Sequence, residues 1–158
     1  MQVQTTAHVL IAADIERVFD ASTDCENLPQ FFTGYQTIPA IVSARTEDGQ
    51  PLREGSRRIV TNSDGTSVEE IILTLKRPHC QEYQLIKGLK PPFSWLVRSA
   101  AGRWRYEEDD AGVKVTWRFE FEIRNILAYF IFQQVVKSPF QVAQQQCLEN
   151  IKTFLETG

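Results

Sequence analysis

The sequence contains few of the residues with which proteins build disulfides and metal sites. It has three cysteines, Cys25, Cys80 and Cys147, and two histidines, His8 and His79. The cysteines are odd in number and widely separated, and no pair of cysteine, histidine or acidic residues shows ligand spacing on a common face. So few histidines also disfavour a nucleophile–histidine pair. We therefore expect no disulfide, no metal, and a protein of a reducing compartment, the cytoplasm.

Long hydrophobic runs and an excess of positive charge are missing as well. The longest apolar run, Ile126 to Phe132, is too short to span a bilayer, and the first residues do not have the pattern of a secretory leader. The net charge is −3, whereas nucleic-acid-binding proteins usually carry a basic excess. The glycines form no phosphate-binding loop, so we expect no cofactor and no nucleic-acid partner. What remains is a soluble protein whose 158 residues are enough for one domain with its own core.

The clearest pattern present is an amphipathic helix near the end of the chain, from Ser138 to Glu156. Ser138 and Pro139 suit the N-cap and the first helical position, and Gln141 completes a capping box. Apolar residues then recur at helical spacing and form one wide stripe, which must be buried against another element. Gln144 falls within this stripe. The apolar residues of the stripe are Phe140, Ala143, Cys147, Leu148, Ile151, Phe154 and Leu155.

Most of the chain before this helix favours β-strands. Residues 3–12 predict a first strand, and Asp14 and Asp24 suit the caps of two short helices. From residue 36 onward, β-favouring runs alternate with turn signals such as Asp48-Gly49 and Asp64-Gly65, which indicates an antiparallel meander. The strands are expected at residues 36–47, 55–62, 66–76, 80–88, 94–107 and 113–124.

This order of one strand, two short helices, six strands and a long helix resembles the START-like superfamily, also called SRPBCC. That superfamily includes the birch-pollen allergens and the polyketide cyclase/dehydrase-like proteins. The resemblance covers essentially the whole chain. The segments that carry it are Ile11 to Phe19, Asp24 to Phe32, Gly55 to Arg58, Asp64 to Glu70 and Gly112 to Trp117.

The resemblance implies the helix-grip fold, which belongs to the α+β class. In this fold a strongly curved, seven-stranded antiparallel sheet grips the long C-terminal helix, and a hydrophobic cavity lies between them. The resemblance also implies that residues 1–158 form a single START-like ligand-binding domain.

If the sheet curves around the helix, large side chains of its last strands line or fill the space between the two. The strand at 113–124 alternates cleanly, with Trp117, Phe119 and Phe121 on its apolar face and charged residues on the other. The side chains expected to contact a ligand in that space are Tyr83, Leu85, Trp104, Trp117, Phe119, Phe121, Phe140, Gln144 and Cys147.

An acidic residue is also expected to face the helix. The apolar alternation within residues 66–76 changes phase near its middle, so either Glu69 or Glu70 should point toward the helix. A carboxylate in that position is partly desolvated, which raises its pKa and suits it to move a proton on a bound ligand. Glu69 and Glu70 are therefore candidates for catalysis, as well as ordinary solvated glutamates.

Tyr83 and Arg98 are the expected partners of such a glutamate. Tyr83 alternates with apolar neighbours and should face inward, where its hydroxyl needs a partner. Arg98 shares the strand face of Trp104 only if no β-bulge falls between them. The adjacent arginines Arg57 and Arg58 are expected on strand faces in solvent.

Three functions follow from these patterns. The leading hypothesis is binding, and with it transport or presentation, of a hydrophobic small molecule such as a lipid, a quinone or an aromatic polyketide. The first alternative is a cyclase or dehydratase-type enzyme that uses the inward glutamate with Tyr83 or Arg98. The second alternative is a chaperone-associated interaction module.

The apolar segment Ile126 to Phe132 lies in an expected helix at 126–136. It is either core or a surface for transient contact with a membrane. The sequence leaves open whether this helix is continuous with the last one through Pro139, and it leaves the oligomeric state open.

Overall fold

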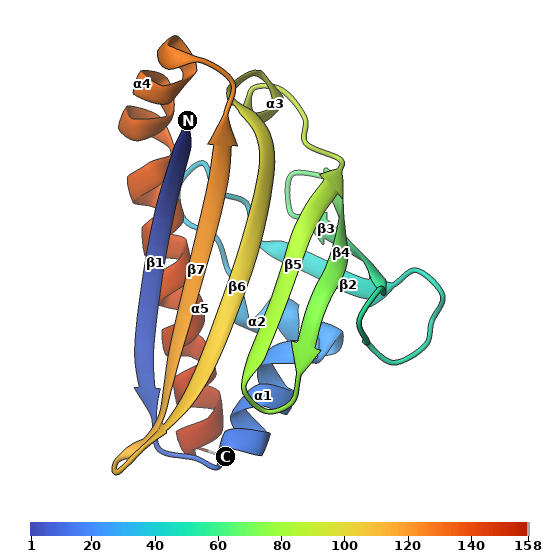
Figure 1. Ribbon diagram of the computed structural model, residues 1–158, viewed down its shortest axis with the longest axis vertical. Helices are drawn as coiled ribbons and strands as arrows, with labels where there is room; N and C mark the ends of the chain where they lie inside the picture. Colours follow the sequence, from blue (N-terminus) through green and yellow to red (C-terminus); the bar gives the residue numbers. More distant parts are fainter. Residues whose placement is uncertain (158) are drawn as a thin grey trace.

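The chain folds into one curved antiparallel sheet with helices on its concave side (Figure 1). The computed structural model describes residues 1–157, and within them seven strands form a single sheet in the order β1-β7-β6-β5-β4-β3-β2. This confirms the α+β helix-grip fold. The strands are β1 (Gln2–Ile11), β2 (Ile41–Thr46), β3 (Arg57–Asn62), β4 (Ser67–Lys76), β5 (Cys80–Lys87), β6 (Val97–Asp109) and β7 (Gly112–Ile123). The helices are α1 (Ile15–Thr23), the 3-10 helix η1 (Cys25–Asn27), α2 (Leu28–Phe31), α3 (Phe93–Leu96), α4 (Ile126–Val135) and α5 (Lys137–Thr157).

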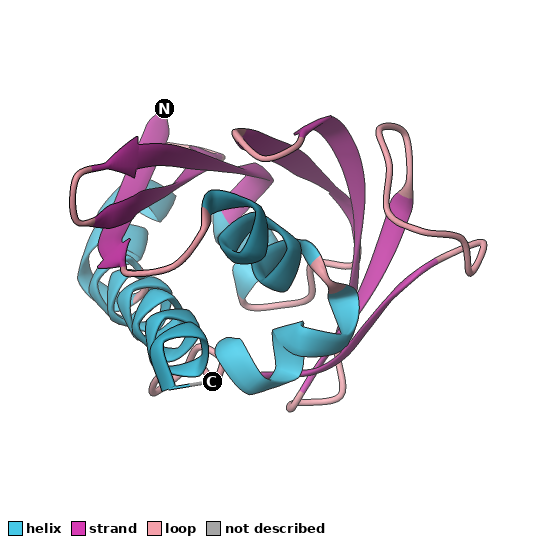
Figure 2. Cartoon of the chain, turned by 90° about the horizontal axis from the view of Figure 1, so that it is seen from below, coloured by secondary structure: helices cyan, strands magenta, loops and turns pink. Residues whose placement is uncertain are grey.

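The long helix α5 lies along the concave side of the sheet, as Figure 2 shows from the end of the molecule. Its apolar stripe is buried, as the spacing of its residues predicts, because that stripe faces β1 and β7. Phe154 is the exception, since its side chain is 44% exposed and its ring packs edge-on against Phe31 at 5.4 Å between ring centroids. The buried residues of α5 are Ala143, Gln144, Cys147, Leu148, Ile151 and Leu155.

The start of α5 differs from the expectation. The helix begins at Lys137, and only Val136 separates it from α4. Ser138 therefore lies inside the first turn, and its prediction as the N-cap is wrong. Pro139 has no N–H with which to bond the carbonyl of Val135, and its ring crowds that carbonyl. Pro139 thus accounts for the end of α4 at Val135, four residues earlier in the chain. The two helices are therefore not continuous, a point that the sequence leaves open.

The polar side of α5 covers the free edge of β1. Gln141 does not complete a capping box, because its amide instead donates to a backbone carbonyl of that strand. Two further side chains of α5 make similar bonds to β1. Backbone carbonyls at the edge of β1 therefore have partners, and they are not free to pair with another strand. These bonds join Gln141 Nε2 to the Thr6 carbonyl, Gln145 Nε2 to the His8 carbonyl and Lys152 Nζ to the Leu10 carbonyl, at 3.1, 2.9 and 2.8 Å.

Two expected strands begin later than the sequence suggests. The strand expected from residue 36 starts at Ile41, because Tyr35 and Ile38 exchange backbone hydrogen bonds of 2.9 Å in a tight turn. Gly34, with φ of 77°, permits that turn. The strand expected from residue 94 starts at Val97, because the prolines before it lead into the short helix α3, and proline suits the start of a helix.

Candidate functional site

An aromatic cluster occupies the concave face of β6 and β7 beneath α5. Trp104 and Trp117 face each other across the two strands and stack with ring centroids 4.6 Å apart. Phe119 and Phe121 continue the row, and each lies 5.0 Å from the ring of Phe140 on α5. These separations are contact distances between rings, so no ligand fits between these side chains as they stand.

The other side chains expected to line the site lie around this cluster. Tyr83 is buried on β5 and packs edge-on against Phe119 at 6.2 Å. Leu85 is half-buried on the same strand. Cys147 is buried in the apolar stripe of α5. The structure therefore brings together on the concave side all nine residues named from the sequence.

Three polar atoms in this interior have no hydrogen-bond partner. Gln144 is completely buried, and its Nε2 makes a long bond of 3.5 Å to the Trp117 carbonyl. Its Oε1 is unpaired, as are Nε1 of Trp117 and Oγ1 of Thr5. An unpaired buried polar group costs about 1–3 kcal/mol, which makes these atoms candidates for contact with a bound molecule or water.

A buried ion pair lies farther along the concave face, on β3 and β4. Arg58 and Glu70 are directly opposite each other in the register, and Nε of Arg58 donates to Oε1 of Glu70 at 2.8 Å. Arg58 is only 4% exposed and Glu70 only 7%. The guanidinium carbon also lies 5.0 Å from the centre of the Tyr83 ring, within the range of a cation–π contact. Burial is the largest single influence on Arg58 and opposes its charged form, but Glu70, Tyr83 and Cys25 together outweigh burial, and the pKa of the guanidinium is raised.

Of the two adjacent glutamates, Glu70 is the one that faces the concave side of the sheet. Glu69 points to the outer face of the sheet, where Arg57 and Lys87 each form an ion pair with it at 3.1 Å. Hydrogen bonds from Arg57 and then from Lys87 lower the pKa of Glu69. β4 pairs regularly with β3 through Glu69 and Glu70, so strand alternation places the two side chains on opposite faces of the sheet. The bulge that inserts an extra residue into β4 comes later, between Ile72 and Thr74.

Tyr83 lies flat against the backbone of β6 because its cross-strand partner is Gly102. A Cβ atom at Gly102 would stand 2.3 Å from Cζ of Tyr83 and 2.4 Å from its hydroxyl oxygen. Desolvation by burial raises the pKa of Tyr83, and the nearby carboxylate of Glu70 raises it further. The hydroxyl therefore stays protonated at neutral pH and serves as a hydrogen-bond donor.

The structure corrects two expectations about arginine. Arg98 does not join the inward cluster, because a β-bulge between Val97 and Ser99 turns its side chain to solvent. Arg58, in contrast, is not in solvent, although the neighbouring Arg57 is half-exposed. The signal that could have identified Arg58 is its alternation with Val60, which is also buried.

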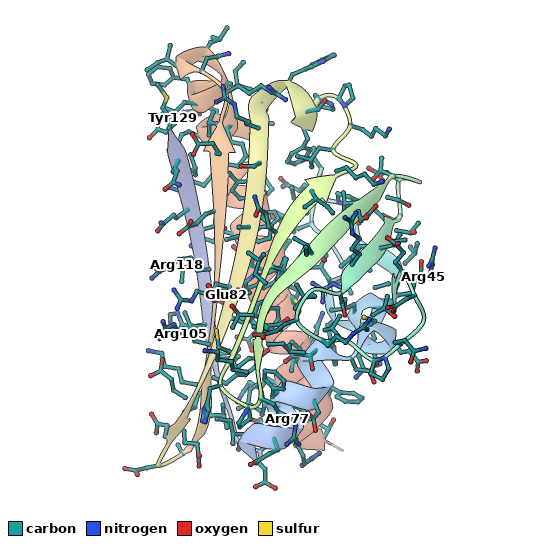
Figure 3. All side chains as sticks on the ribbon, turned by 45° about the vertical axis from the view of Figure 1, so that its right-hand side comes forward. Arg45, Arg77, Glu82, Arg105, Arg118 and Tyr129 are labelled. Carbon is teal, nitrogen blue, oxygen red and sulfur yellow. The ribbon has the colours of Figure 1, made fainter. Side chains whose placement is uncertain are left out.

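The outer face of the sheet carries the charged side chains that strand alternation predicts. Arg105 and Arg118 are exposed there, and Arg103 lies 3.5 Å from Glu82 in a loose ion pair. Figure 3 shows Glu82, Arg105 and Arg118 projecting from this side. Among residues 1–157, no group of three or more histidine, cysteine or acidic side chains could hold a metal ion.

An open groove of about 1070 Å³ leads toward the ion pair from the surface. Its walls are α1 and η1 on one side and β2 with the following loop on the other, and Cys25 and Thr46 are among its lining residues. A bidentate ion pair between Arg77 and Asp20 lies at one end, with distances of 2.8 and 2.9 Å. Burial raises the pKa of Cys25, and Arg58 opposes that shift, so the thiol lies between the groove and the buried guanidinium.

A second hydrogen-bonded group, which the sequence did not indicate, lies beside α1. The hydroxyl of Tyr106 is 2.6 Å from Oγ of Ser22, and it accepts a bond of 2.9 Å from Nε2 of Gln81. All three side chains are buried and have partners, so this group joins α1 to the sheet and leaves nothing for a ligand to satisfy.

Comparisons with known proteins agree with this architecture. A family model described as "Polyketide cyclase / dehydrase and lipid transport" matches residues 2–156. Ginseng major latex-like protein 151 from Panax ginseng has a TM-score of 0.75 and 14% identity, and the match covers 98% of each chain. Ara h 8.0201 has a TM-score of 0.71 and 16% identity over the whole of both chains.

A protein from a biosynthetic pathway is also among the similar structures. The di-domain ARO/CYC BexL from the BE-7585A biosynthetic pathway has a TM-score of 0.75 and 15% identity, over 98% of this chain and 50% of that one. No curated protein sequence matches the chain. At such identities the structural similarity demonstrates the fold alone.

Proposed function

The chain belongs to the polyketide cyclase/dehydrase and lipid transport family, and on this basis we propose that it binds a hydrophobic small molecule whose polar group contacts Arg58 and Tyr83. The observation that carries the proposal is a buried ion pair beside a buried phenol on a concave face that is otherwise aromatic. Such a combination, a largely apolar surface with a few converging polar groups, is typical of small-molecule sites.

The polar groups indicate which part of a ligand they would hold. Arg58 and Tyr83 are both donors, since the guanidinium stays charged and the phenol stays protonated. They would together bind an oxygen, such as that of a carbonyl or a hydroxyl. Glu70 already neutralises Arg58, so the site favours a neutral ligand over a strongly anionic one.

The unpaired atoms of the interior supply a second anchor for the same ligand. Oε1 of Gln144 can accept a hydrogen bond from a hydroxyl group of the ligand, and Nε1 of Trp117 can donate one to a ligand oxygen. A ligand with oxygens at two positions of an apolar skeleton would satisfy both ends of the concave face. Quinones and aromatic polyketides have this distribution of oxygens.

The groove beside Cys25 is the proposed route of entry. It is open to solvent, and its lining includes apolar side chains such as Leu52 and Leu75. Cys25 is half-buried between this groove and Arg58. A ligand bound at Arg58 would therefore slow alkylation of Cys25 by iodoacetamide, while Cys80, on the outer side of β5, would react at an unchanged rate.

A titration with Nile red, a neutral apolar fluorescent probe with a carbonyl oxygen, tests the proposal together with mass spectrometry of an organic extract of the purified protein. The double variant Arg58→Met with Glu70→Leu removes both charges and leaves neither one unpaired. We expect saturable binding that weakens roughly tenfold or more, since a hydrogen bond to a charged group contributes about 1.5–3 kcal/mol. The matched control is Arg57→Met with Glu69→Leu on the outer face. Equal affinity in both variants, with an extract free of any bound compound, would disprove the proposal.

A second candidate function, a cyclase-type enzyme, is favoured by one specific observation. The carboxylate of Glu70 lies inside the fold next to two donors, Arg58 and Tyr83. In an aldol closure Glu70 would remove a proton from a carbon next to a ketone, while the donors stabilise the oxygen of the carbonyl that is attacked. The measurement is turnover of a linear poly-ketone. Glu70→Gln should abolish turnover, and Tyr83→Phe should reduce it.

A further inference from the structure

One end of the molecule exposes a group of large apolar side chains, which we call the α3–α4 surface. Trp95 on α3 is 68% exposed, and Leu127 and Phe130 on α4 are 68% and 60% exposed. Monomeric soluble proteins rarely expose so many large apolar side chains together, and such patches usually mark interaction sites. The surface consists of Trp95, Ile126, Leu127, Phe130, Ile131 and Val135.

These side chains are exposed because α4 is apolar on two opposite sides. Ala128 and Phe132 of α4 face the core and are almost completely buried. The opposite side of the helix repeats apolar residues at the same helical spacing, from Ile126 to Val135, and nothing within residues 1–157 covers it. The apolar segment is thus both core and surface, and Phe132, expected as part of a membrane contact, belongs to the core.

The two parts of the surface are joined to one another. Arg124, just before α4, donates through Nε to the Ser94 carbonyl at 2.7 Å and through its backbone N–H to the Leu96 carbonyl at 3.0 Å. The side chain of Asn125 caps α4 by accepting from a backbone N–H at 2.9 Å. Figure 1 shows α3 and α4 at the same end of the sheet. The apolar side chains therefore project from an ordered surface.

The two chain segments that form this surface carry charges of one sign. Residues 87–98 and 124–137 contain no aspartate or glutamate, although the whole chain has a net charge of −3. Their five basic residues are Lys87, Lys90, Arg98, Arg124 and Lys137. Two acidic residues beside these segments, Glu69 and Glu122, form ion pairs with Lys87 and with the amino group of Met1. Exposed apolar side chains with a basic border match the chemistry of a membrane that contains anionic lipids, because acyl chains accept the former and headgroups attract the latter.

We propose that the α3–α4 surface docks on the face of an anionic lipid bilayer. No helix within residues 1–157 is long and apolar enough to cross a membrane, so α4 would lie in the plane of the interface. Trp95 on α3 and Tyr129 on α4 are at this end of the molecule, and tryptophan and tyrosine are the residues enriched at membrane–water boundaries. Of the groove's lining residues, Arg77 lies at the opposite end of the molecule and Arg45 along its side (Figure 3), so docking leaves the groove accessible. The proposal does not depend on the identity of any ligand inside the fold.

Co-sedimentation with vesicles tests this proposal. Vesicles of phosphatidylcholine mixed with phosphatidylglycerol should bind the protein, and vesicles of phosphatidylcholine alone should bind it much less. The difference should shrink as salt is added, because salt screens the charges. Lys90→Gln with Lys137→Gln should lower the partition coefficient on the order of 25-fold, at roughly fivefold for each charge near the surface. The matched control, Lys76→Gln with Lys114→Gln, changes two lysines away from the α3–α4 surface.

The apolar part is tested by Leu127→Ser, which should lower partitioning roughly tenfold, the value expected for removal of one inserted leucine side chain. Leu73→Ser is its control, since Leu73 is 52% exposed on β4, away from the α3–α4 surface. Circular dichroism verifies that each variant is folded. Absence of sedimentation with the anionic vesicles, or equal losses in both leucine variants, would overturn the proposal. So would a dimer, seen by analytical ultracentrifugation, that Leu127→Ser converts to a monomer, because a second copy would then be the partner.

Discussion

Replacement of Glu70 by glutamine examines the buried ion pair directly. The side chains of Arg58 and Glu70 are 5% and 10% exposed, and their atoms Nε and Oε1 are 2.8 Å apart. Glutamine has nearly the shape of glutamate and keeps one acceptor oxygen, but it removes the negative charge. The guanidinium of Arg58 would then be buried without a compensating negative charge, and its contact with the Tyr83 ring would offset only part of its desolvation.

The expected loss of unfolding free energy is about 3–5 kcal/mol, the range measured when one partner of a buried pair is removed. In a chain of this length each kcal/mol lowers the melting temperature by about 2–4 °C, so a decrease of about 6–20 °C is expected. Urea unfolding followed by circular dichroism measures the change, and an unaltered slope shows that the unfolding transition itself is the same.

The neighbouring residue provides a matched control. Glu69 also forms ion pairs, but its partners Arg57 and Lys87 are 50% and 70% exposed. Glu69 itself is only 8% exposed, but solvent screens its exposed partners, so Glu69→Gln should lower the urea midpoint much less than Glu70→Gln does. The double variant Arg58→Met with Glu70→Leu should regain most of the stability that Glu70→Gln loses, because it leaves no buried charge. Equal midpoints for the two single variants would refute the reasoning and indicate that water solvates Arg58.

Two further predictions concern the tyrosine on β5 and an ion pair at the groove. Gly102→Ala should displace the ring of Tyr83, lower stability by about 1–3 kcal/mol and alter the near-ultraviolet circular dichroism; an unchanged spectrum and midpoint would contradict it. A hydrogen bond from Arg77 lowers the pKa of Asp20 below its ordinary value of 3.8, so this pair stabilises the fold above that pH, and the benefit disappears as the pH falls through the lower, folded value. Arg77→Gln should therefore be less stable than the parent at neutral pH and equally stable in strong acid, as measured by urea unfolding; a difference that persists in acid would count against the role of Asp20.

The elements with long, regular patterns could be predicted from the sequence. Residues 113–123 alternate without interruption, and the structure has β7 there with its aromatic side inward. The stripe of α5 is also confirmed, because each turn from Ala143 to Leu155 contributes at least one buried residue. The strand pattern is reliable because a shift of one residue in its register would move every apolar side chain of the strand to solvent.

The polar residues of the interior are harder to predict, because their direction depends on local irregularities and on strand register. A β-bulge turns Arg98 outward, whereas Glu70 faces inward through the regular pairing of β4 with β3. An isolated arginine is rarely buried, so the sequence predicts Arg58 in solvent. Arg58 can be buried because Glu70 lies directly opposite it on the neighbouring strand. The pattern of neither strand by itself predicts the register that brings these two residues together.

The strand order has a consequence for synthesis of the protein on the ribosome. The first strand, β1, pairs with β7 from Gln2 opposite Glu122 to Ile11 opposite Val113, and its other edge receives side chains of α5. Both neighbours, β7 and α5, come after the other six strands in the chain, so β1 waits without its partners until they are translated. A nascent chain that stalls before residue 112 would carry an unpaired, β-prone β1, the state in which this domain is most exposed to misassembly.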